Sequence, residues 1–94
     1  MKLNVNFEIF DLTDKALSDK ASKFIAEMLL EHKGDSLKLY ELAMHINKNE
    51  SIDIDTTDLK LIEEAVKNNP RYTNLVKGAI LKEIESQKVG SKKD

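Results

Sequence analysis

The first ten residues alternate between apolar and polar side chains, and this period limits the fold more than any other feature of the sequence. A repeat of two residues is the period of a half-buried strand, and β-branched and aromatic residues on the apolar face favour the same assignment. The apolar positions are Leu3, Val5, Phe7 and Ile9. The pattern therefore predicts a strand over residues 2–10 with one buried face.

Four later segments carry apolar residues at the spacing of an amphipathic helix. Ser18 is expected to cap the first helix with its hydroxyl, and Pro70 fits the first position of the fourth. Asp35 or Ser36 is expected to start the second. The predicted helices span residues 18–33, 36–48, 56–68 and 70–87.

Two short segments offer partners for the first strand. Residues 11–15 form a polar turn, after which Ala16 and Leu17 are expected to run back briefly against the strand. Residues 51–55 again alternate with period two, which places Ile52 and Ile54 in a sheet beside the first strand.

These elements predict one α+β domain over residues 1–87, with four helices packed on a small antiparallel sheet built on the N-terminal strand. Residues 88–94 are expected to form a disordered basic tail. A nine-residue strand with only two short partners leaves part of its edge unpaired, and such an edge invites another chain. The polar positions of this strand are therefore candidate interaction residues: Lys2, Asn4, Asn6 and Glu8.

The composition excludes several classes of site. The 94 residues include no cysteine, so disulfides and thiolate sites are impossible, and the three glycines build no phosphate loop. His32 and His45 belong to no recognisable catalytic triad. We therefore expect no enzyme, no catalytic residue, no cofactor and no small-molecule substrate.

A calcium loop is suggested by the spacing of the carboxylates between Asp53 and Glu64. Its sixth position must be glycine for the sharp turn, and this position is Asp58. The same residues already read as a strand followed by a capped helix. The carboxylates are therefore interpreted as turn and cap residues, and no metal site is expected.

No apolar run approaches the roughly 20 residues of a membrane span, and the first residues lack the apolar core of a signal peptide. The protein is therefore expected to be cytoplasmic and to have no membrane partner.

The charge is unevenly distributed and leaves two alternatives open. Residues 1–69 carry 9 Lys and 14 Asp+Glu, whereas residues 70–94 carry 6 Lys+Arg and 3 Asp+Glu. A helix-turn-helix-like pair over residues 56–87 could make the protein a small DNA-associated regulator that uses Arg71 and Lys77. A pI of about 5.7 argues against nucleic acid as the partner. Alternatively, the acidic residues could act as a decoy of nucleic acid.

The order of several segments resembles small uncharacterised open reading frames of tailed phages and prophages. The segments that carry the resemblance are residues 11–14, 34–40, 52–59 and 75–81. The resemblance implies a phage setting, and therefore the host cytosol. The expected function is that of a non-enzymatic accessory protein in assembly, host regulation or anti-defence. It would act by contact with another protein or with a second copy of itself as a homodimer.

Overall fold

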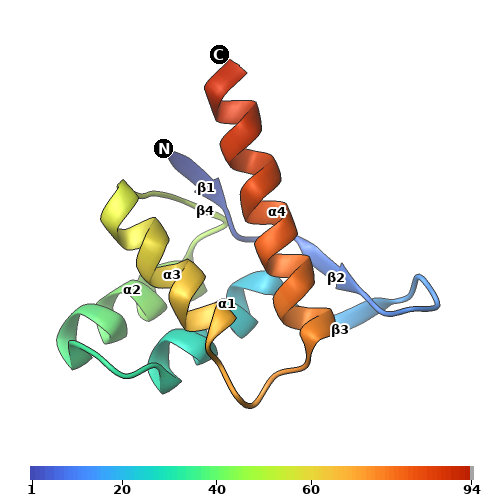
Figure 1. The fold of residues 1–94 in the computed structure, drawn as a ribbon, viewed down its shortest axis with the longest axis horizontal. Coiled ribbons are helices and arrows are strands. Elements are labelled where there is room, and N and C mark those ends of the chain that lie inside the picture. Colours follow the sequence, from blue (N-terminus) through green and yellow to red (C-terminus); the bar gives the residue numbers. More distant parts are fainter. Residues whose placement is uncertain (94) are drawn as a thin grey trace.

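The protein is an α+β domain of four helices and short antiparallel strands, as predicted, but the strands form two small sheets and not one (Figure 1). The computed structural model describes residues 1–93, with side chains described up to Lys88. The strands are β1 (Lys2–Asn4), β2 (Glu8–Phe10), β3 (Ala16–Lys20) and β4 (Ser51–Asp53), and the helices are α1 (Ala21–Glu31), α2 (Ser36–Lys48), α3 (Thr56–Lys67) and α4 (Asn74–Lys93).

The prediction of one continuous nine-residue strand is wrong. The segment forms two separate strands, β1 and β2, and residues 5–7 between them belong to neither. The Asn4 side chain accepts a hydrogen bond from the Asn6 backbone N–H at 2.9 Å, a local bond that competes with ladder pairing. The alternation itself holds, since Leu3, Val5 and Ile9 are all buried. Each half of the segment joins a different two-stranded sheet.

β1 pairs antiparallel with β4, so Ile52 lies in a sheet beside the first strand as predicted, whereas Ile54 follows the end of β4. In this pair Leu3 stands opposite Ile52. The other edge of β1 is met by a side chain of α4 at Asn4. The Gln87 amide accepts from the Asn4 N–H at 2.8 Å and donates to the Asn4 C=O at 3.0 Å. Gln87 therefore satisfies both backbone groups as a neighbouring strand would.

β2 pairs antiparallel with β3, so the return arm expected at residues 16 and 17 exists and extends to Lys20. The connecting turn is held by the Asp11 carboxylate, which accepts from the N–H groups of Thr13 at 2.8 Å and Lys15 at 3.1 Å. Asp14 adopts a positive φ of 63°, a conformation that Asp tolerates better than most residues. The hairpin projects from the helices at one end of the molecule (Figure 1).

α1 begins at Ala21, three residues later than predicted, because Ser18 belongs to β3. The N-cap position is Lys20, whose side chain makes no capping hydrogen bond. The Ala21 N–H donates instead to the Phe7 C=O at 2.9 Å. A backbone carbonyl from the neighbouring segment thus replaces the expected hydroxyl of Ser18.

α2 and α3 agree with the predicted helices, with α3 one residue shorter. The Asp35 carboxylate accepts from the N–H groups of Leu37 and Lys38 at 3.1 and 3.2 Å. The Asp55 carboxylate accepts from the Asp58 N–H at 2.8 Å. Aspartate is among the strongest N-cap residues, so local chemistry sets both starts.

α4 differs from the prediction at both ends. It begins at Asn74 instead of residue 70, and its first helical hydrogen bond joins the Lys77 N–H to the Thr73 C=O at 3.1 Å. It continues to Lys93, so the segment predicted as a disordered tail is helical in its described part. Asp94 lies outside the described residues.

One hydrophobic core joins both sheets to all four helices. Side chains from every helix and from three strands are almost completely buried in it. The largest of these are Leu3, Ile9, Ile25, Met28, Leu29, Ile46, Ile62, Ile80 and Ile84.

The contact between Gln87 and β1 is testable by hydrogen exchange. Gln87→Ala should speed exchange of the Asn4 amide and lower the free energy of unfolding by about 1 kcal/mol, because two hydrogen bonds are lost. Ser86→Ala, an exposed neighbour on α4, is the control. Unchanged exchange at Asn4 in Gln87→Ala, measured by NMR, would contradict this role.

Candidate interaction surfaces

The four polar residues predicted to form one interaction edge do not share an edge. Lys2 and Asn4 lie on β1, Asn6 lies in the connection, and Glu8 lies on β2. All are exposed except Asn6, which is half-buried. Because Gln87 already bonds both backbone groups of Asn4, the predicted open edge is occupied at that residue.

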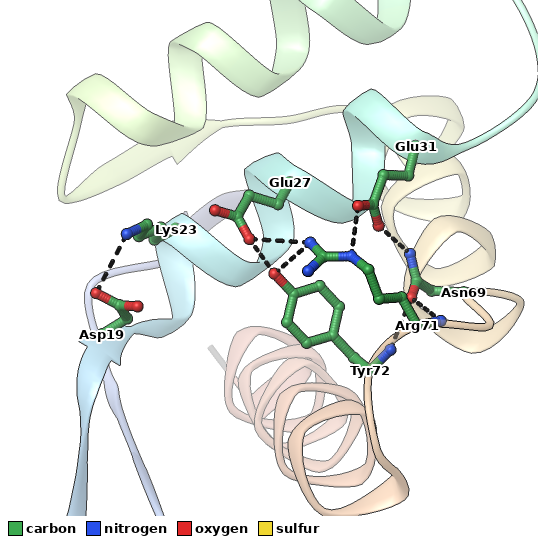
Figure 2. A network of polar contacts seen from close by, with 7 residues as sticks. All are labelled: Asp19, Lys23, Glu27, Glu31, Asn69, Arg71 and Tyr72. Carbon is green, nitrogen blue, oxygen red and sulfur yellow. Dashed lines mark hydrogen bonds and ion pairs between the residues drawn. The ribbon is translucent and has the colours of Figure 1, made fainter.

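The loop between α3 and α4 is organised by Asn69, which is the one buried polar residue among those whose burial is described. Its side-chain oxygen accepts from the N–H groups of Arg71 at 2.8 Å and Tyr72 at 3.0 Å, and its amide nitrogen donates to Glu31 at 2.8 Å (Figure 2). The first two bonds hold the loop in a non-helical turn. This explains why α4 cannot begin at Pro70.

Arg71 lies against α1, where its guanidinium contacts two glutamates one turn apart (Figure 2). Its Nε donates to Glu31 at 2.6 Å and one terminal nitrogen donates to Glu27 at 3.2 Å. The guanidinium also lies 4.3 Å from the centre of the Tyr72 ring. The sequence shows Glu27 and Glu31 as an unfavourable like-charge pair, and Arg71 is the cation that relieves it.

Tyr72 completes this cluster. Its hydroxyl donates to Glu27 and accepts from Arg71 at 2.7 Å, and its ring meets Phe24 edge to face at 5.4 Å between centroids. Burial, together with the hydrogen bond to Glu27, raises the pKa of Tyr72 to about 12. The hydrogen bond from Tyr72, aided by Arg71, lowers the pKa of Glu27 below its ordinary value of 4.5. The cluster thus favours an ionised Glu27 and a neutral Tyr72.

Lys77, the other basic residue predicted to meet a partner, also bonds within the chain. Its Nζ donates to the Asn69 C=O at 2.7 Å. The structure therefore brings Arg71 and Lys77 to the same loop, where both stabilise it. Sequence reasoning did not find Glu27, Glu31, Asn69 and Tyr72 as one cluster, because they come from segments about 40 residues apart.

The two histidines lie at separate helix ends. The His32 backbone N–H donates to the Leu29 C=O at 3.3 Å at the end of α1. The His45 Nδ1 lies 3.2 Å from the Asn49 amide nitrogen beyond α2. Within residues 1–93, no group of three or more His, Asp or Glu side chains is placed to hold a metal ion.

A surface on α1 and α2 exposes large apolar side chains. Leu30 on α1 is 54% exposed, and Leu37 and Tyr40 on α2 are 67% and 55% exposed. Tyr40 directly follows the buried Leu39 in α2 but faces solvent. Met44 follows Tyr40 by one turn and is half-buried. We call Leu30, Leu37, Tyr40 and Met44 the outer apolar surface.

A groove of about 230 Å³ runs between α1 and α2 beside this surface. Leu30 borders it on α1, and Met44 borders it on α2. The remaining lining residues are Lys23, Ala26, Glu27, Ala43 and Asn47. The lining thus combines four apolar side chains with three polar ones, which is the usual composition of a site that accepts part of a protein.

Comparison of the chain with protein-family models, curated proteins and solved structures gave no match. Among the described helices, none combines the length and apolar character needed to cross a membrane.

Asn69 should be a major determinant of stability. Asn69→Ala would leave two backbone N–H groups without a partner and would remove one of the two hydrogen bonds to Glu31, which should lower the free energy of unfolding by about 1–3 kcal/mol. Asn68→Ala, a change at the exposed neighbouring asparagine, should alter it by less than about 0.5 kcal/mol. Urea unfolding compares the two variants, and equal losses would exclude the proposed role of Asn69.

The Glu27 carboxylate should contribute pH-dependent stability. Its pKa in the folded state lies below the ordinary 4.5, so the folded state binds fewer protons than the unfolded state between these values. The contribution is therefore present above pH 4.5 and is lost as the pH falls through the folded pKa.

Tyr72→Phe removes the hydrogen bond that lowers the pKa of Glu27 most, so this pKa should rise in the variant. NMR titration of the Glu27 side-chain carboxyl measures the change. Tyr40→Phe, at an exposed tyrosine outside the cluster, should leave the pKa of Glu27 unchanged. An identical Glu27 titration in wild type and Tyr72→Phe would contradict the assignment.

Proposed function

We propose that this protein acts by binding another protein, without catalysis, and that the outer apolar surface of α1 and α2 is its binding surface. The observation that carries the proposal is the exposure of Leu30, Leu37 and Tyr40 on two neighbouring helices. Single exposed apolar residues are common on soluble proteins, but a group beside a groove marks a contact site.

The pattern of α2 supports this surface. Leu39, Leu42 and Ile46 are buried against the core, as expected for an amphipathic helix. Leu37, Tyr40 and Met44 repeat at the same three- and four-residue spacing but lie on the opposite side of the helix. One apolar side of α2 is buried in the core. The other apolar side is exposed and can be buried by a second protein.

The partner that best fits is an amphipathic helix of another protein, laid along the groove between α1 and α2. A helix presents apolar anchors every three or four residues, which matches the spacing along α2. Lys23 at one end of the groove and Asn47 on its wall offer polar contacts to the rim of such a helix. This arrangement would add a third helix to the α1–α2 pair.

The biological setting in the proposal rests on the resemblance to small phage and prophage proteins. It places the protein in a host cytosol as an accessory factor in assembly, host regulation or anti-defence. We do not extend the proposal to a DNA-associated regulator, because Arg71 and Lys77 both donate to acceptors within the chain.

Site-specific photo-crosslinking tests the surface. A photoreactive phenylalanine analogue at Tyr40 should crosslink in host cells to one helical segment of one protein. That segment, prepared as a peptide, should bind the wild-type protein and should bind Tyr40→Asp at least about tenfold more weakly, because the change places a charge within an apolar contact.

The control places the same analogue and the same substitution at Leu12, which is 92% exposed on the β2–β3 hairpin. Leu12→Asp should bind the peptide like the wild type, since it changes an exposed leucine of another surface. Equal loss of binding in both variants, or crosslinks without a common segment, would contradict the proposed surface.

A further inference from the structure

β3 is an edge strand in which the order of charges is self-complementary. When two copies of the segment lie antiparallel, positive residues of one copy stand opposite negative residues of the other. The sequence from residue 14 to residue 20 is Asp-Lys-Ala-Leu-Ser-Asp-Lys. Read backward, each aspartate of this segment falls on a lysine and each lysine on an aspartate, with Leu17 at the centre. We propose that two copies of the protein associate through β3 in an antiparallel pair centred on Leu17.

The outer edge of β3 is available for such a pair. β3 has β2 as its one neighbouring strand in the described sheet. Alternate residues of β3 are exposed, including Ala16, Ser18 and Lys20. Edge strands are usually protected from pairing by charges of one sign, commonly lysine, which repel a second copy. The segment of β3 carries both lysine and aspartate. In one register of an antiparallel pair these opposite charges face each other, so the repulsion that usually protects an edge strand is absent.

The backbone of β3 restricts the possible registers. The Lys15 C=O accepts from the Asp11 N–H at 2.8 Å, and the Ala21 N–H donates to the Phe7 C=O at 2.9 Å, so both residues direct backbone groups toward the β2 side. The ladder is irregular between these two contacts, because Glu8 pairs with Lys20 and Phe10 pairs with Ala16, which leaves residues 17–19 of β3 opposite Ile9 alone. Lys15 and Ala21 nevertheless both face β2, and the alternation of backbone groups along a strand then directs the even positions between them toward the outer edge. A second copy must place Ala16 or Ser18 opposite Ala16 or Ser18.

Charge selects one of the registers that remain. With Leu17 on the two-fold axis, Ala16 of one copy stands opposite Ser18 of the other and Lys15 stands opposite Asp19. With Ser18 on the axis, Lys15 stands opposite Ala21, and with Ala16 on the axis, Lys15 stands opposite Leu17. No charged pair forms in either of these registers. Opposite charges directly across an antiparallel pair are stabilising and like charges are destabilising. The register centred on Leu17 is therefore favoured.

Asp19 is suited to a contact with a second copy. In the single chain its carboxylate contacts Lys23 at 3.5 Å, with side chains that are 39% and 54% exposed (Figure 2). Exposed pairs of this kind hold little energy, so Asp19 can accept a second cation without losing a strong contact. The opposing Lys15 would supply that cation in both halves of the symmetric pair.

The contact is small, which sets its expected strength. The pair forms backbone hydrogen bonds between Ala16 and Ser18 and two Lys15–Asp19 contacts, which is well below the area of a stable interface. The dimer should therefore have a dissociation constant of roughly micromolar to millimolar, and it should weaken as salt screens the ion pairs. This inference is independent of the proposed partner of α1 and α2.

Charge reversal tests the ion pairs by sedimentation equilibrium at low salt. Lys15→Asp and Asp19→Lys should each weaken the dimer by roughly tenfold, because two symmetry-related pairs become repulsive. The double variant Lys15→Asp/Asp19→Lys should restore the wild-type dissociation constant. The proposal would be overturned if the wild type were monomeric at millimolar concentration. It would also be overturned if neither charge reversal changed the dissociation constant of the dimer.

Disulfide trapping tests the register, and the absence of native cysteine leaves no competing thiol. Opposed residues in such a pair have Cα atoms about 5.5 Å apart, within the range of a disulfide. A mixture of Ala16→Cys chains with Ser18→Cys chains should crosslink readily, whereas either variant alone should remain largely uncrosslinked. Crosslinking of Ser18→Cys alone would show the register centred on Ser18 and contradict the one proposed.

A last variant separates the two surfaces. Tyr40→Asp should leave the dimer unchanged, because Tyr40 lies on α2, away from the hairpin (Figure 1). Loss of the dimer in Tyr40→Asp would place self-association on the outer apolar surface and overturn the assignment to β3. The proposed function fails separately, through the peptide-binding experiment.

Discussion

Neither sheet of this protein is large enough to be stable by itself, and this constraint explains how the rest of the molecule is arranged. A two-stranded sheet is marginal in water, so each pair of strands must bury its apolar residues against helices. α1 meets much of this need, because five of its eleven residues are buried. It packs against β3, α2 and α3. The two sheets, separated by the break after Asn4, are joined through the one core.

Polar contacts then hold the α3–α4 loop and the C-terminal part of α4 in place, in addition to the packing of the apolar core. Asn69 and its neighbours fasten the α3–α4 loop to α1, through bonds whose partners are far apart in the chain. Gln87 fastens α4 to β1 in the same manner. Arg71 and Lys77 are likewise held by acceptors within the protein itself.

The two proposed contact surfaces belong to elements on different parts of the molecule (Figure 1). The outer apolar surface belongs to α1 and α2, whereas the edge of β3 belongs to the projecting hairpin. A pair of copies joined at β3 would keep both outer apolar surfaces accessible, so that one dimer could bind two partner helices. Such bivalence raises the effective affinity for a partner that is itself repeated.

The sequence by itself determined the class of fold, the extent of α2 and α3, and the place of Ile52 in a sheet beside the first strand. These depend on apolar periodicity and on caps such as Asp35 and Asp55, which are properties of residues close together in the chain. The candidate site was less predictable. The sequence singled out Arg71 and Lys77 as basic residues, but it gave no sign that Glu27, Glu31 and Asn69 would bind them.

Tertiary structure decided the elements whose ends depend on distant groups. The Phe7 carbonyl replaces Ser18 at the start of α1, and the Asn69 side chain delays α4 beyond Pro70. Each of these outcomes requires a hydrogen bond between segments whose approach follows from packing of the core. A local pattern states which side chains must be buried, and only the assembled fold determines which polar groups then meet.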